Sequence, residues 1–298
     1  MNHWLKIALL SSLPVLSHAH TVSPYILPEA FDVTTSNVSF QSAVTVEKFF
    51  IPSNNFKTTY VVTQPNGQQV SVNPAAALKR FSVAEFDIAG EGTYRIQTKD
   101  AVGNSAKYAL VDGRWLRVRP VRTPMPQQAN AETKAPEAAK PAAPKPANAQ
   151  PPRVINADQV PANAQTFDAK TSLIAETYVT KGKPSEIPAP TKKGFELKFI
   201  THPSELFAGD SLKAQVLYNG KAVPNLEFEV FKGASNLDAE KTRELPVVKA
   251  NAKGEIEVPF EKAGVYLITA SFPEANPDNT KKPQAESFIY GLTVEVSE

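Results

Sequence analysis

The chain has 298 residues, with 32 lysines and arginines against 30 aspartates and glutamates, and it contains no cysteine. A formal net charge of +2 gives no support for a nucleic-acid groove, which needs clustered basic residues. Without cysteine there is no disulfide, no thiolate nucleophile and no thiolate metal site.

The first 19 residues have the pattern of a cleaved export signal. Lys6 is the one charge before an apolar run over 7–16, and the small residues Ser17 and Ala19 precede the expected cut. That run is too short for a membrane-spanning helix, which needs about 20 residues. We therefore expect residues 1–19 to be removed, leaving a periplasmic chain that starts at His20 and is not inserted in the membrane.

Residues 20–123 are expected to form an N-terminal β-sandwich. Short stretches rich in β-branched residues occur at 38–41, 44–46, 58–62, 68–72, 81–88 and 93–97. Asn66-Gly67 separates two of them and is a strong hairpin signal, because both central residues of that turn need a positive φ. The spacing of turn signals is typical of an immunoglobulin-like sandwich.

Residues 124–152 are mostly proline and alanine and contain no valine, isoleucine, leucine or aromatic residue. Such a segment buries too little apolar area to offset the entropy lost on ordering. It is therefore predicted to be a disordered linker with polyproline II character that separates two domains.

Residues 153–298 are expected to form a C-terminal β-sandwich. Alternating stretches lie at 195–199, 211–218, 226–231, 254–260, 264–270 and 288–296. Residues 153–193 contain few strand signals and are expected to drape over this second domain. The predicted fold is all-β, with two immunoglobulin-like β-sandwich domains joined by the Pro/Ala-rich linker.

Three segments carry a resemblance to a known family: Tyr25-Ile26-Leu27-Pro28, Glu196–Leu226 with Thr201-His202-Pro203, and Ala263–Ile268. They resemble periplasmic proteins known mainly as a domain of unknown function and often labelled as components of nickel/cobalt uptake. The resemblance implies a two-domain β-sandwich with a link to transition-metal handling. Relatives often carry a histidine near 49–56, where this chain has none, so a metal site that needs that imidazole is not expected here.

Two histidines, His20 and His202, remain after the expected cleavage. His20 would then carry a free α-amine beside its imidazole, and the two can chelate one metal ion. With His202 as a second imidazole, the site would have three nitrogen ligands, which suits Cu(II) and also Ni(II). The alternatives are that His20 is a consequence of where the cut falls and that His202, next to Pro203, completes a turn.

Catalytic signals are weak. No Gly-x-Ser-x-Gly elbow occurs. Glu227 and Glu229, like Glu255 and Glu257, are spaced as residues on the solvated face of a strand. Trp115 has basic neighbours and is interpreted as a packed strand end, with ligand stacking as the alternative.

We expect a non-enzymatic periplasmic accessory protein that binds or helps take up a transition metal (nickel, cobalt or copper). Its partner would be an envelope metal-uptake system or another envelope protein. The alternatives are a structural or interaction module of the envelope without metal, and a carbohydrate-binding module.

Overall fold

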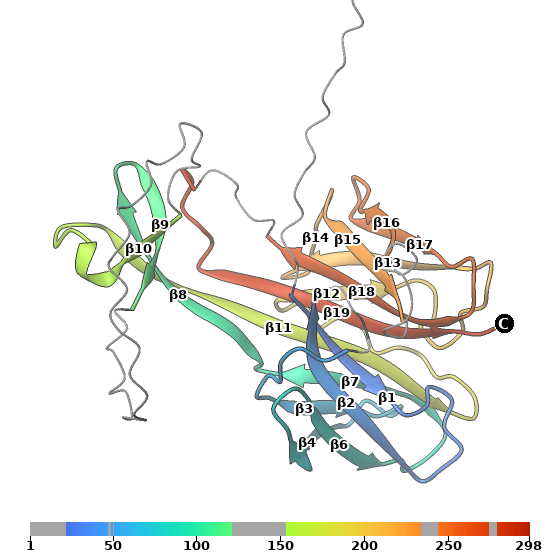
Figure 1. Ribbon diagram of the computed structural model, residues 1–298. Helices are drawn as coiled ribbons and strands as arrows, with labels where there is room; N and C mark the ends of the chain where they lie inside the picture. The colour runs from blue at the N-terminus through green and yellow to red at the C-terminus, as the bar shows by residue number, and fades with distance from the viewer. Residues whose placement is uncertain (1–21, 47–48, 50, 121–152, 234–243, 274–278) are drawn as a thin grey trace, which may run out of the picture.

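The computed structural model describes residues 22–46, 49, 51–120, 153–233, 244–273 and 279–298 (Figure 1). The expected leader, the expected linker and His20 lie outside these residues. The described part contains 19 strands and one short 3₁₀ helix, η1 (Ala157–Gln159). In this part of the chain, no helix has the length and apolar composition needed to cross a membrane.

Two small sheets flank a large one. We call them the N-terminal, C-terminal and central sheets. The N-terminal sheet has the order β1 (Val22–Pro28), β2 (Asn37–Val46), β6 (Ser82–Asp87), β5 (Ala76–Ala77). The C-terminal sheet consists of β12 (Phe195–Phe199), β13 (Ser211–Tyr218), β14 (Lys221–Ala222) and β17 (Glu255–Pro259).

The central sheet has 11 strands and receives strands from both halves of the chain. Those from the first half are β3 (Thr59–Thr63), β4 (Gln69–Val72), β7 (Gly92–Lys99), β8 (Val102–Val111) and β9 (Arg114–Arg119). Those from the second half are β10 (Val154–Asn156), β11 (Thr166–Lys181), β15 (Glu227–Lys232), β16 (Glu244–Lys249), β18 (Gly264–Phe272) and β19 (Glu286–Val296).

Strand β11 joins the two halves. On one edge it pairs antiparallel with β8 and then with β7, and on the other edge it pairs parallel with β19. The expectation that 153–193 drapes over the second domain is wrong here, because β11 is a strand of 16 residues. Its strand signal is masked by charged residues, one of which, Glu176, is buried.

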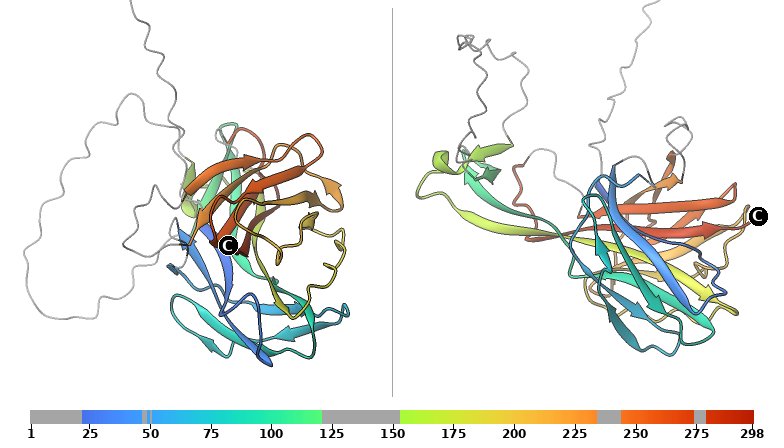
Figure 2. Two further views of the ribbon diagram at one scale, coloured as in Figure 1. Left: turned by 90° about the vertical axis from the view of Figure 1, so that its right-hand side faces the viewer. Right: turned by 60° about the horizontal axis from the view of Figure 1, so that its bottom comes forward.

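The two faces of β11 belong to two different cores. Leu173, Ala175 and Val179 pack with the N-terminal sheet, whereas Ile174 and Tyr178 pack with the C-terminal sheet. The prediction of an all-β fold with immunoglobulin-like sandwiches is confirmed. The structure adds that the two sandwiches lie on opposite faces of one shared sheet (Figures 1 and 2).

Strand β1 fastens the N-terminal sheet to strands of the second half. At Gly291 of β19, an added Cβ would lie 1.9 Å from the carbonyl oxygen of Pro24, so only glycine allows this approach. Next to this crossing, Tyr25 and Phe49 pack against Leu267 of β18. The first strand of the chain is therefore held by the last two.

A β-rich projection extends from this body, and we call it the arm (Figures 1 and 2). It consists of residues 105–119 and 153–170, which include β9, β10, η1 and the outer parts of β8 and β11. Strand β9 pairs antiparallel with β8, and β10 adds to β9 in parallel. The arm is thus an extension of the central sheet beyond the two cores.

Candidate functional site

His202, one of the two predicted metal ligands, has both ring nitrogens in hydrogen bonds. Its Nδ1 accepts from the Ser204 backbone N–H at 3.1 Å, and its Nε2 lies 2.9 Å from the Ser185 carbonyl oxygen. Because a carbonyl only accepts, Nε2 carries the hydrogen and the ring is a neutral donor–acceptor. Nε2 also lies 3.4 Å from Thr93 Oγ1 of β7. His202 thus links a loop of the second half to the first half, and a metal would have to displace one of these bonds.

His20, the other predicted ligand, lies outside the described residues. Among the residues that are described, no group of three or more His, Cys, Asp or Glu side chains is placed to hold a metal ion. The role of His20 and His202 as metal ligands stays a prediction.

The structure also shows how far the start of β1 lies from His202. The crossing of Pro24 over Gly291 lies level with Ala175 of β11. His202 lies near Thr93, and Thr93 hydrogen-bonds to Thr180, which is five residues after Ala175 on β11. Five strand residues span about 17 Å, and Val22, where β1 begins, is on the far side of the crossing. This placement favours separate roles for the two histidines.

A fully buried carboxylate occupies the centre of the shared sheet. Glu176 of β11 receives hydrogen bonds from Arg95 (3.1 Å), Gln97 (3.3 Å), Tyr290 (3.2 Å) and Tyr178. These donors come from β7, β11 and β19. The arrangement satisfies a carboxylate that has no solvent exposure of its own, which suits a structural clamp rather than an acid–base site.

Burial and charge shift the pKa values around Glu176. Burial first, and then the Glu176 carboxylate, raise the pKa of Tyr178 and Tyr290 well above the usual value. Burial opposes the charge on Arg95, but the Glu176 carboxylate together with Tyr178 and Tyr290 outweighs it, so the pKa of Arg95 is raised. The two tyrosines stay neutral donors and Arg95 stays charged.

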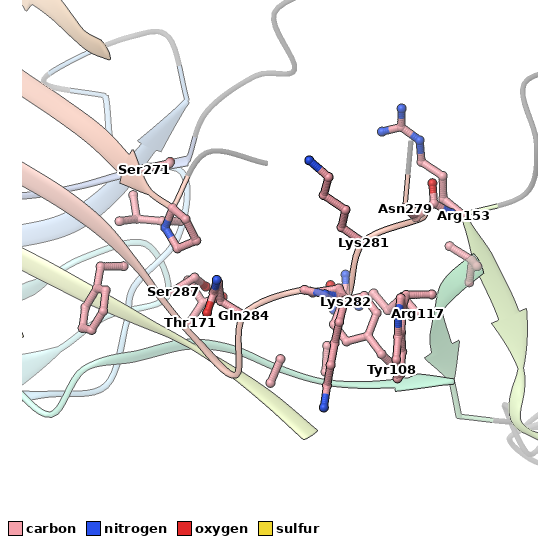
Figure 3. Close-up of a pocket in the computed structure, with 18 residues that line it drawn as sticks. Tyr108, Arg117, Arg153, Thr171, Ser271, Asn279, Lys281, Lys282, Gln284 and Ser287 are labelled. Atoms are coloured by element: carbon pink, nitrogen blue, oxygen red, sulfur yellow. The ribbon is translucent and has the colours of Figure 1, made fainter. Parts of the chain in front are cut away.

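The candidate binding site is a groove of about 600 Å³ where the arm meets the body (Figure 3). Its floor is made of small side chains from neighbouring strands, Ala106, Ala169, Thr171 and Ser287. The hydroxyls of Thr171 and Ser287 lie 2.8 Å apart and hydrogen-bond to each other. A hollow forms here because small residues of the central sheet stand between larger ones on the arm and on the body.

The charged residues among the described lining of this groove all have one sign. Four cationic side chains line it, Arg117, Arg153, Lys281 and Lys282, and no acidic side chain is among the described lining residues. Figure 3 shows Lys282 and Arg117 beside Tyr108 on the arm side, facing the polar side chains of Thr171, Ser287 and Gln284 on the body side. The arrangement favours negatively charged ligands.

Backbone hydrogen bonds hold these cations in place. The Trp115 N–H donates to the Asn279 carbonyl at 2.8 Å, and the Lys170 N–H donates to the Ala285 carbonyl at 2.8 Å. These two bonds hold the segment that carries Lys281 and Lys282 along the arm. The Arg117 N–H likewise donates to the Arg153 carbonyl at 3.0 Å.

Trp115 forms part of the wall behind the cations. It is 6% exposed, and its ring centroid lies 5.1 Å from that of Phe167 in an edge-on arrangement. Lys282 Nζ lies 4.7 Å from the Phe167 centroid and 5.6 Å from that of Trp115, within range of a cation–π interaction. The interpretation of Trp115 as a packed strand end is confirmed, and its rings position Lys282.

Sequence reasoning did not identify this groove. Its cations come from three segments far apart in the chain, so spacing could not show that they meet. One signal was present in Arg-Trp-Leu-Arg-Val-Arg over 114–119, where Arg117 and Arg119 recur at the strand period and therefore point to one face.

Comparison with solved structures finds β-domain proteins at low similarity. The D0-D1 domain of intimin is 9% identical, with 93% of this chain and 99% of that chain covered and a TM-score of 0.22. Trypsin-activated alpha-2-macroglobulin from Escherichia coli is 10% identical, with 93% of this chain and 16% of that chain covered and a TM-score of 0.23. Such scores lie below those of a shared overall fold, so the fold assignment above rests on the strands themselves.

Comparison with curated proteins finds no match. A family model does match, over residues 17–274, and its description is "Domain of unknown function (DUF4198)". This range includes most of the described structure and extends from β1 into the strands of the second half.

Proposed function

The chain belongs to the family of the domain of unknown function DUF4198, and on that premise we propose that it is a non-enzymatic accessory protein of the cell envelope that binds a small anionic ligand. The binding site in this proposal is the groove at the base of the arm. A volume of about 600 Å³ is typical of small-molecule sites.

The observation that carries the proposal is the one-signed lining of the groove. Four cations gather there in a chain whose formal net charge is only +2. A concave surface lined by one sign of charge focuses the potential and raises the local concentration of oppositely charged ligands. Because Lys282 and Arg117 are on backbone that is hydrogen-bonded to neighbouring segments, little ordering remains to be done on binding.

The same lining supports binding rather than catalysis. General acid–base chemistry needs a group such as His, Asp or Glu within reach of the substrate, and the described lining residues include none of these. Hydroxyls are present at Ser271 and Ser287, but the described lining has no His, Asp or Glu to activate them as a base. Arginine and lysine are suited to holding an anion in place.

The envelope location in this proposal is supported by the export-signal pattern of residues 1–19. A periplasmic binding protein would pass its ligand to, or hold it for, a neighbouring envelope protein such as a metal-uptake system. The arm offers a surface for that contact, because it stands away from the two cores (Figure 2).

The experiment is calorimetric titration with inorganic phosphate and with sulfate at constant ionic strength. We expect binding by the unaltered chain and at least about tenfold weaker binding by K281Q/K282Q, since each lost charge removes roughly 1 kcal/mol or more of attraction. K198Q removes an exposed lysine of β12 outside the groove and should bind as the unaltered chain does. Equal affinities in all three proteins, or no binding by any, would contradict the proposal.

Transition-metal binding is a second candidate, favoured by one observation from the sequence. Cleavage after Ala19 would leave His20 with an α-amine and an imidazole that can bind nickel, cobalt or copper together. Val22, two residues further on, begins the edge strand β1 and is 40% exposed, so solvent reaches the start of this strand. If the chain binds neither anions nor metals, the remaining interpretation is a structural module without a ligand.

A further inference from the structure

We infer that the ligand carries two anionic groups, held in two adjoining hollows on either side of Arg117. This inference rests on the anion-binding function proposed above and specifies the chemical class of the ligand. The class is a small organic molecule with two phosphate or carboxylate groups at its two ends.

The groove continues into a second hollow along the arm. This hollow measures about 900 Å³, and it shares Ala106 and Arg117 with the first. Its other lining residues are Ser105, Lys107, Val118, Arg119, Pro120, Asn156 and Asp158. Arg117 therefore stands at the junction, where one guanidinium can reach a ligand in either hollow.

Cations lie at both ends of this double hollow. Lys281 and Lys282 line only the first hollow, on the segment held at Trp115, whereas Lys107 and Arg119 line only the second, near the end of β9. Together the two hollows are lined by six cationic side chains and one acidic one, Asp158. A single compact anion would leave one of the two positive ends without a counter-charge, whereas a ligand with two anionic ends matches both.

The strand register gives the spacing between the two ends. Arg117 and Arg119 are two residues apart on β9, which is about 7 Å along a strand. The segment with Lys281 and Lys282 is held at Trp115, two residues before Arg117. The two cationic ends are thus about 13 Å apart along the strand, so the two anionic groups should lie between about 7 and 13 Å from each other.

Two linked anions bind more tightly than two separate ones. Once the first group is bound, the second meets its hollow at an effective concentration in the millimolar range for a short linker. This gain requires that the linker spans the sites. A ligand with two anionic groups at the right spacing should therefore bind at least tenfold more tightly than its counterpart with one group.

The probes are fructose 1,6-bisphosphate, fructose 6-phosphate and inorganic phosphate, which differ in the number and linkage of phosphate groups. Trp115 provides the signal, because the other tryptophan, Trp4, lies in the leader that is expected to be removed. Fluorescence titrations are run with the chain that begins at His20 and with its R119Q and K198Q variants, and calorimetry confirms the affinities.

We expect the bisphosphate to bind at least tenfold more tightly than either single-phosphate probe. In R119Q this advantage should fall to less than about threefold while the affinity for inorganic phosphate changes little, and K198Q should behave as the parent protein. If fructose 6-phosphate matches the bisphosphate, or if R119Q keeps the full advantage, the two-anion inference is overturned while anion binding stands. If no probe binds, the proposed function falls as well.

Discussion

Arg95 and Glu176 form a buried ion pair across β7 and β11, with Arg95 Nε 2.9 Å from Glu176 Oε1. Glu176 has no solvent exposure, and both side chains lie on the face of the central sheet that packs against the C-terminal sheet. The opposite faces of the same two strands carry the N-terminal core, through residues such as Tyr94 and Ala175. The pair therefore lies where the two sandwiches meet.

Replacing Arg95 alone should be much worse than replacing both partners. R95M leaves Glu176 buried without its counter-charge, and loss of one partner of a buried pair costs about 3–5 kcal/mol. R95M/E176L removes both charges and should recover most of that loss. Urea unfolding measures the free energies, with K213Q as a control for the exposed pair of Lys213 and Glu257, which is worth about 1 kcal/mol or less. A double variant as unstable as the single one would contradict this role.

Gly291→Ala should detach β1 from the central sheet. The added Cβ would lie 1.9 Å from the Pro24 carbonyl oxygen, and backbone on both sides would have to move. We expect a loss of at least about 3 kcal/mol in the free energy of unfolding, because the change disrupts packing between two sheets. G90A is the matched control, since an added Cβ there meets nothing within 4 Å. If both variants unfold at the same urea concentration, the close crossing does not hold β1.

Cleavage between residues 124 and 152 should not separate the two halves of the protein. Trypsin has a site at Lys134 in this Pro/Ala-rich segment, whereas Lys140 and Lys145 are each followed by a proline that blocks the cut. The strands before it, β7 and β8, pair with β11 after it over most of the length of β11. The two fragments should therefore elute together in size-exclusion chromatography and separate only in denaturant. Separate elution of the two fragments under native conditions would contradict the shared sheet.

Much of the fold follows from local sequence signals. The hairpin predicted at Asn66-Gly67 joins β3 and β4, although only Gly67, at a φ of +82°, has the positive φ that was expected of both residues. The turn at Asn219-Gly220 joins β13 and β14, and both residues have positive φ. These turns are encoded by neighbouring residues, so they can be read from sequence.

The features missed from the sequence depend on contacts between distant segments. In the sequence alone, Glu176 is interpreted as a surface residue, because nothing near it indicates that Arg95 lies beside it in the fold. Its charge therefore made both the strand β11 and the shared sheet hard to predict. Arg117, Arg153 and Lys282 meet only because β11 brings the arm and the segment before β19 together. No spacing rule links residues that are paired through a third strand.

Stability should fall at high pH partly through Tyr25. Burial raises the pKa of Tyr25 from 10.0 to about 12, and the hydrogen bond from Gln41 offsets this only in part. The neutral phenol is favoured in the folded state, so the stabilisation is complete below pH 10 and is lost as the pH rises from 10 towards 12. Urea unfolding between pH 8 and pH 11.5 should show a steeper loss for the unaltered chain than for Y25F. Parallel curves for the two proteins would contradict the shift.

Metal binding, if it occurs at the processed N-terminus, should depend on the free α-amine of His20. Calorimetric titration with Cu(II) and Ni(II) should show binding by the chain that begins at His20, and much weaker binding by a chain with one extra residue before it. H20A should abolish the site, and affinity should fall below about pH 6 because protons compete for the imidazole and amine nitrogens. We expect H202A to leave the affinity unchanged, since both ring nitrogens of His202 are in hydrogen bonds within the fold. Lower affinity in H202A would instead make His202 the second imidazole, and equal affinity of the processed and extended chains would rule out the N-terminal site.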